Sequence, residues 1–207
     1  MTTQATDPLE ILQRVRNAPP KPRPGERCDM CNEMVPDDHE HVVNVESRSL
    51  MCTCRGCWML FTSDGAGGGR FRAVPDRYAV VEDFTMSDGA WESFQIPVSV
   101  AFFFHNSSLG QVTAFYPSPA GATESLLELD AWDGLVAANP LLATLYSDVE
   151  ALLVRTGEDE HAAFLVPIDA CYELVGHMRR LWRGFDGGRE ARDALDQFFV
   201  DLRARCR

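Results

Sequence analysis

Cysteine is the residue type whose spacing in this sequence points most directly to chemistry. Five of the seven cysteines lie between Cys28 and Cys57, and they include two Cys-x-x-Cys pairs. Each pair can turn both sulfur atoms toward one ion, and two pairs supply the four thiolates that structural zinc prefers. The pattern therefore predicts a site for Zn2+ made of four residues: Cys28, Cys31, Cys54 and Cys57.

Three neighbouring side chains are alternative ligands of this site. Cys52 lies two residues before Cys54 and can replace one member of the second pair. His39 and His41 lie in a charged segment, and an imidazole either binds a metal ion directly or donates a hydrogen bond to a ligating sulfur. Without a metal, the five thiols would be left open to oxidation.

Iron is the alternative occupant. Four thiolates also hold a single iron ion or an iron–sulfur cluster, and the Cys52-x-Cys54-x-x-Cys57 run is dense enough in sulfur for a cluster. The spacing excludes neither metal. Zinc favours a structural role, whereas iron favours a small redox protein that passes electrons through the cysteines.

A short β-hairpin must bring the two cysteine pairs together. Residues 41–46 and 48–52 are partly alternating runs, and the polar residues 46–48 suit the turn between them. The segment after Cys54 can begin a helix with the second pair in its first turn, which would give a treble-clef finger. If that segment is extended instead, the same ligands would form a zinc ribbon.

The rest of the chain divides into segments around this finger. We expect a short helix beginning at Asp7 and a proline-rich linker over residues 1–27, the cysteine finger over 28–63, and a glycine-rich hinge over 64–77. Residues 78–207 should form an α+β body, an antiparallel sheet with packed helices. Arg70, Arg72 and Arg77 make a small basic cluster near the hinge.

The body alternates strand and helix patterns. Val98–Phe104 is apolar except for Ser99, which predicts a central strand covered on both faces and paired with Gln111–Tyr116. A second hairpin is expected from Val149–Arg155 and Ala162–Val166. Two amphipathic helices follow, one capped by Asp169 and one over Arg189–Arg205.

A loop rich in proline and small residues is expected after the second strand of the body, over residues 117–125. Loops on a rigid scaffold often carry functional groups, so this segment is a candidate ligand or partner loop through four residues: Tyr116, Ser118, Thr123 and Glu124. A turn followed by a helix cap explains the same composition.

Composition and charge exclude several classes of function. The formal net charge of −12 opposes attraction to nucleic acid or to anionic membranes. The sequence shows no apolar run long enough to span a bilayer and no signal-peptide core, so we expect a cytoplasmic protein without membrane insertion.

No catalytic motif stands out in the sequence, which favours a non-enzymatic role. The nucleophile elbow, the His-Glu-x-x-His motif and the dinucleotide fingerprint are all missing. The best triad-like combination is His105 with Ser118 and Glu124, based only on the expected pairing of neighbouring strands.

Several motifs together resemble an uncharacterised actinobacterial family encoded beside high-affinity nickel–iron hydrogenases. They cover most of the chain after Cys28: Cys28-x-x-Cys31, His39-x-His41, residues 46–48, Cys52-x-Cys54-x-x-Cys57, and residues 65–70, 115–125 and 182–184. The resemblance implies a role in hydrogenase assembly, maturation or electron transfer. It implies a protein partner, a hydrogenase subunit or a maturation factor, for a zinc-containing interaction module.

Overall fold

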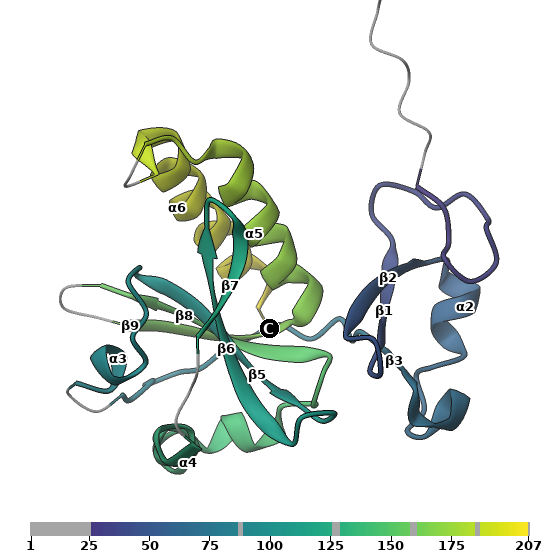
Figure 1. Ribbon diagram of the computed structural model, residues 1–207, viewed down its shortest axis with the longest axis horizontal. Helices are drawn as coiled ribbons and strands as arrows, with labels where there is room; N and C mark the ends of the chain where they lie inside the picture. The colour runs from purple at the N-terminus through teal and green to yellow at the C-terminus, as the bar shows by residue number, and fades with distance from the viewer. Residues whose placement is uncertain (1–25, 87–88, 126–128, 158–160, 185–186, 207) are drawn as a thin grey trace, which may run out of the picture.

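The computed structural model describes residues 26–86, 89–125, 129–157, 161–184 and 187–206. The expected helix at Asp7 and most of the proline-rich linker lie outside these ranges. Within them, the chain is a mixed α+β structure with two antiparallel sheets. The cysteine finger contains the small sheet and the body contains the large one (Figure 1).

The finger is a three-stranded sheet with strand order β2-β1-β3 and one short helix beside it. The expected hairpin is confirmed, because β1 and β2 pair antiparallel with His41 opposite Cys52. The elements are β1 (Glu40–Asn44), β2 (Ser49–Thr53), α2 (Arg55–Met59), the 3-10 helix η1 (Ala66–Gly69) and β3 (Phe71–Ala73).

Strand β3 lies in the segment that the sequence suggested as a hinge. It pairs with β1, with Val43 opposite Arg72, and therefore completes the sheet of the finger. The glycines of η1 allow the chain to return from α2 to this strand. Gly67 has a φ of +59°, and a Cβ atom added there would lie 2.9 Å from the ring of Phe61.

The body is built on a six-stranded antiparallel sheet with strand order β4-β9-β8-β5-β6-β7. Both predicted hairpins, β5 with β6 and β8 with β9, are confirmed by the pairing. The strands are β4 (Ala79–Val80), β5 (Val100–Asn106), β6 (Gln111–Ser118), β7 (Gly121–Ser125), β8 (Glu150–Thr156) and β9 (His161–Pro167).

Helices cover both faces of this sheet (Figure 1). One face packs against the two long C-terminal helices, and the other against the shorter elements. The C-terminal helices are α5 (Ile168–Leu181) and α6 (Gly188–Arg205); the shorter elements are α3 (Ala90–Ser93), α4 (Leu129–Ala138) and the 3-10 helix η2 (Pro140–Thr144).

Successive phenylalanines of β5 enter the two halves of the core. Phe102 and Phe103 are both fully buried; Phe102 packs on the side of α5 and α6, and Phe103 packs on the opposite side with Phe94. Alternation along a strand sends neighbouring side chains to opposite faces. The prediction of a central strand covered on both faces is therefore confirmed.

The segment 117–125 is a hairpin and not the expected loop. Strand β6 continues to Ser118, and β7 returns antiparallel to it with Tyr116 opposite Thr123. Strand β5 pairs with β6 only as far as Phe115, so Pro117 lies where β6 has one neighbour in the sheet. A residue without an amide hydrogen is tolerated at such a position.

Strand alternation also turns one face of the finger toward the body. His41, Val43 and Val45 follow one another at every second residue of the finger's first strand and its continuation. Val43 belongs to the core formed by β5, β8 and α5, and Val45 packs against it. On the same seam, Arg72 of β3 donates a hydrogen bond to the carbonyl oxygen of Ser147 at 3.1 Å. The finger is therefore packed onto the body.

Among the described residues, no helix combines the length and the apolar character that crossing a bilayer requires.

Candidate metal centre

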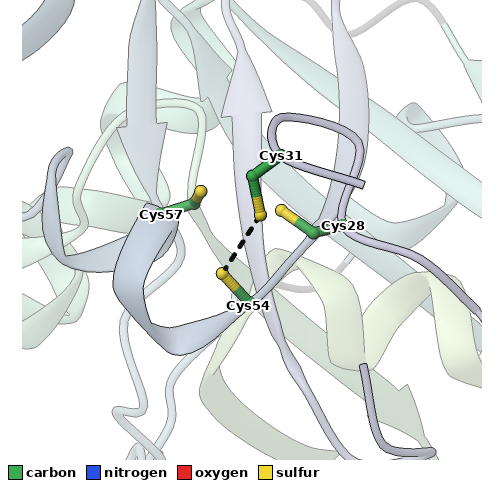
Figure 2. A group of neighbouring side chains, drawn as sticks. All are labelled: Cys28, Cys31, Cys54 and Cys57. Atoms are coloured by element: carbon green, nitrogen blue, oxygen red, sulfur yellow. Dashed lines mark hydrogen bonds between the residues drawn. The ribbon is translucent and has the colours of Figure 1, made fainter. Parts of the chain in front are cut away.

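Four cysteine side chains converge at one end of the finger (Figure 2). One sulfur atom from each of Cys28, Cys31, Cys54 and Cys57 lies within 4.8 Å of the other three. The Sγ atoms of Cys31 and Cys54 are 3.7 Å apart, too far for the disulfide length of about 2.05 Å. Four sulfurs at about 2.3 Å from one ion would be separated by about 3.8 Å. The cluster is therefore shaped to hold a metal ion.

The first cysteine pair lies on a tight turn stabilised by the backbone. Asn32 donates its amide to the carbonyl oxygen of Cys28 at 2.8 Å, and Cys28 donates to the carbonyl oxygen of Glu33 at 2.8 Å. Asn32 takes a left-handed conformation with φ of 64°, which asparagine tolerates better than most residues. This turn directs Cys28 and Cys31 toward the same point.

The second pair lies at the start of α2. Cys54 is the N-cap residue with an extended backbone, and its carbonyl oxygen accepts a hydrogen bond from the amide of Trp58 at 3.0 Å. Cys57 is in the first turn of the helix. A turn, a hairpin and then cysteines at a helix start correspond to the treble-clef expectation and not to the extended segment of a zinc ribbon.

Two hydrogen bonds between Asp29 and Cys52 join the two halves of the centre. Asp29 donates its amide to the carbonyl oxygen of Cys52 at 2.8 Å, and the amide of Cys52 donates to Oδ2 of Asp29 at 2.8 Å. This reciprocal pair fastens the first turn to β2, the strand that leads to Cys54. The cysteine positions are thus fixed by the fold of the finger.

The surroundings of the sulfur atoms shift the pKa values of the cysteines in opposite directions. Burial alone raises the pKa of Cys28, but hydrogen bonds from the amides of Cys54, Cys31 and Met30 outweigh burial and lower that pKa to about 6. At Cys57, burial and hydrogen bonds with the neighbouring thiols raise the pKa well above its usual range. One thiolate is therefore available at neutral pH, while Cys57 needs a metal ion to displace its proton.

The alternative ligands form a cluster of their own. His39, His41 and Cys52 each offer an atom within 4.8 Å of the other two, and the four cysteines of Figure 2 form a separate group. Cys52 points from β2 toward His41, its partner on β1. The four-cysteine site is therefore complete without these three side chains.

The candidate ligand residues of segment 117–125 do not converge. Thr123 donates its hydroxyl to Oγ of Ser118 at 2.8 Å, a contact within the hairpin, and Tyr116, the cross-strand partner of Thr123, packs against the core on that same face of the sheet. Glu124 instead lines a cavity of about 280 Å³ between the finger and the body, together with Arg48 and Tyr172. A ligand role for this segment stays a prediction.

The triad-like combination is wrong. His105 pairs with Val112 near one end of β6, whereas Ser118 lies at the other end of that strand. Nδ1 of His105 instead lies 3.0 Å from Oγ of Ser147. The expected hairpin already carried this signal, because its turn sets the register and places His105 beside the start of β6.

The arginines near the hinge pair with carboxylates instead of forming an open basic cluster. Arg70 contacts Glu46 at 3.0 Å, and Arg72 contacts Asp148 at 3.2 Å. Arg77 binds Glu150, whose side chain is fully buried, through two nitrogen atoms at 2.7 and 2.5 Å. These acidic partners are 24 to 76 residues away in the chain, so sequence spacing held no signal for them.

Fold and site together define a class: an α+β protein whose body carries a treble-clef-like finger with a cluster of four cysteines that could hold a metal ion. The chain belongs to a family of unknown function (DUF5947), whose model matches residues 27–206. No curated protein and no solved structure matched the chain. The matched range covers both the finger and the body.

Proposed function

We propose that this protein is a cytoplasmic, non-enzymatic accessory protein whose finger holds one structural zinc ion and binds a protein partner. The partner is a subunit or a maturation factor of a nickel–iron hydrogenase. The four-sulfur cluster supports the metal, and the motif resemblance described above supports the hydrogenase context.

The close approach of the four sulfur atoms is the observation that carries the proposal. All lie within 4.8 Å of one another, which is room for a single ion. An iron–sulfur cluster would place its cysteine ligands on different iron atoms and so farther apart. Four protein ligands also leave no open position, which favours a structural over a catalytic role.

Exposed apolar side chains on the finger support a partner-binding role. Met34, Met59 and Leu60 expose 53, 60 and 66% of their surface. Met34 lies beside the first cysteine turn, and the other two lie at the end of α2. Methionine is common on surfaces that bind other proteins. A metal ion at the cysteines would hold both elements in place and so present these side chains to a partner.

Co-purification tests the partner. Tagged full-length protein, isolated from cells that make the hydrogenase, should carry a hydrogenase subunit or maturation factor. Cys57→Ser and the pair Met59→Asp with Leu60→Asp should remove that partner, whereas Leu109→Asp, an exposed leucine on the body, should retain it. Unchanged hydrogenase activity after deletion of the gene would contradict the proposal.

A further inference from the structure

A second group of metal-binding side chains lies at the seam between the finger and the body. His39 and His41 are two residues apart, so an extended chain places both on one face of the finger. Cys52 is the cross-strand neighbour of His41 and therefore shares that face. One atom from each of the three residues lies within 4.8 Å of the others.

Hydrogen bonds at Nδ1 set the tautomer of both imidazoles and leave Nε2 as the atom that can bind a metal ion. Nδ1 of His39 lies 2.8 Å from the carbonyl oxygen of Pro36, and Nδ1 of His41 lies 2.9 Å from Oδ2 of Asp169. Both partners can only accept, so each Nδ1 carries a proton. In the neutral rings, both Nε2 atoms then hold a lone pair. A histidine that donates to a carbonyl or carboxylate in this way is typical of metal sites.

The Nε2 atom of His39 has no hydrogen-bond partner among the described residues. The side chain is only 4% exposed, so water does not readily satisfy this atom. Oε2 of Glu26 lies 3.6 Å from this atom, beyond hydrogen-bond distance. His39 Nε2 and Glu26 Oε2 therefore face each other with a lone pair on each atom. A cation between them would satisfy both.

Glu26 supplies a fourth donor close to the same point. It faces His39, and its negative charge acts on Cys52, whose pKa is raised first by burial and then by Glu26. Two imidazoles, one thiolate and one carboxylate suit a divalent transition-metal ion. On bound zinc the ligand atoms would be about 3.3–3.8 Å apart. The two imidazoles and the thiol already lie within 4.8 Å of one another, whereas the exposed Glu26 side chain would have to turn inward from His39 to complete the set.

An entry path to this group exists along the seam. A groove of about 430 Å³ between the finger and the body is lined by His39, His41 and Asp169. Solvent therefore reaches this group through His41, whose side chain is 21% exposed. The four-cysteine site lies elsewhere on the finger and uses none of these side chains.

We propose that His39, His41 and Cys52, with Glu26 as the fourth ligand, bind a divalent transition-metal ion at a second site. Asp169 orients His41 from the body, so an ion at this site would tie the finger to α5. This inference goes beyond the structural zinc of the finger, because the two sites share no ligand.

Metal counting with Zn2+ tests the second site. Full-length protein saturated with Zn2+ and then desalted should retain two ions per chain. Cys52→Ser and His39→Phe should each lower the count to one, and Asp169→Asn should weaken the second ion roughly 10- to 100-fold. The matched controls Cys206→Ser and His177→Phe alter a cysteine and a histidine outside both clusters and should retain two ions.

Co2+ identifies which site each variant has lost. Wild-type protein should show the charge-transfer absorption of a four-thiolate site and a weaker contribution from a single thiolate. Cys52→Ser should remove only the second contribution, which also shows that the finger remains folded. One ion per chain in the wild type, or two ions in Cys52→Ser, would overturn the proposal.

Discussion

Nδ1 of His41 lies 2.9 Å from Oδ2 of Asp169, and this contact joins the first strand of the finger to the first turn of α5. The two residues are 128 positions apart in the chain. Both side chains are about three-quarters buried or more, with 21 and 25% exposure. The contact links the position of the cysteine finger to the core of the body.

Loss of the Asp169 carboxylate should loosen this link. Asp169→Ala removes the acceptor of His41 and an acidic group from the first turn of α5, so we expect a loss of about 1–2 kcal/mol in the free energy of unfolding. Denaturant titration measures this loss, and hydrogen exchange in β1 should rise. Glu173→Ala, an exposed acidic residue on the same helix, is the matched control and should change little. Equal behaviour of the two variants would contradict the role of Asp169.

The buried ion pair beside the seam should be more costly to break. Glu150 has no exposed side-chain surface and accepts two hydrogen bonds from Arg77 and one from the amide of Tyr146. Arg77→Ala leaves this carboxylate without its cation, so we expect destabilisation by about 3–5 kcal/mol. Denaturant titration of the purified variant measures it.

A second variant distinguishes the buried charge from lost packing. Combining Arg77→Ala with Glu150→Gln removes the charge and keeps an acceptor for Tyr146, so it should recover a large part of the stability. If the double variant is no more stable than Arg77→Ala alone, the buried charge is not the cause of the loss.

Metal affinity at the four-cysteine site should depend on pH in two stages. Above about pH 6 Cys28 is already a thiolate, while Cys31 and Cys57, with raised pKa values, still hold protons that the metal must displace. Below about pH 6 Cys28 also binds a proton, so metal binding releases one more. The logarithm of the affinity should therefore fall more steeply below pH 6 than above it.

Competition with a chelating dye between pH 5 and pH 8 measures this slope. The titration should use the Cys52→Ser variant, which lacks a ligand of the second cluster, so that the measured affinity refers to the four-cysteine site alone. A slope that stays constant through pH 6, or becomes shallower below it, would show that the amides around Cys28 do not hold a thiolate.

Local pattern was enough to predict the elements that carry the cysteines, but not the contacts between distant parts. The Cys-x-x-Cys pairs and the alternation in residues 41–52 predicted the hairpin because both signals lie within thirty residues. Strand β3 has only three residues and is defined by pairing with β1, so local pattern assigned it to a hinge. Pro117 and Pro119 made a loop the natural expectation for residues 117–125. A proline disrupts a strand only where its missing amide hydrogen would bond to a neighbouring strand, and the sequence does not show which positions have such a neighbour.

The second cluster was only partly visible in the sequence. The sequence held part of the signal: His39 and His41 are two residues apart, and the expected hairpin brings Cys52 opposite His41. Together these two features place three possible ligands on one face of the finger. Asp169 and the burial of His39 depend on how the finger packs against the body. Sequence spacing holds no information on that packing, so the sequence alone places His39, His41 and Cys52 as alternatives at the four-cysteine site.

Removal of the metal should unfold the finger and leave the body folded. The core of the body is formed largely by its own sheet and by α5 and α6, whereas the small sheet of the finger depends on the cysteines to fix both ends of its hairpin. A strong chelator should therefore abolish protection from hydrogen exchange in β1 to β3 and preserve it in β5 and β8. Simultaneous loss in both parts would contradict this division.

Elemental analysis with a visible spectrum on anaerobically purified Cys52→Ser protein tests the four-cysteine site most directly. We expect one zinc ion per chain, no absorption in the visible range, and no bound metal after the further change Cys57→Ser. Iron with visible absorption that dithionite bleaches would contradict the zinc assignment, and a chain without any metal would contradict the site itself.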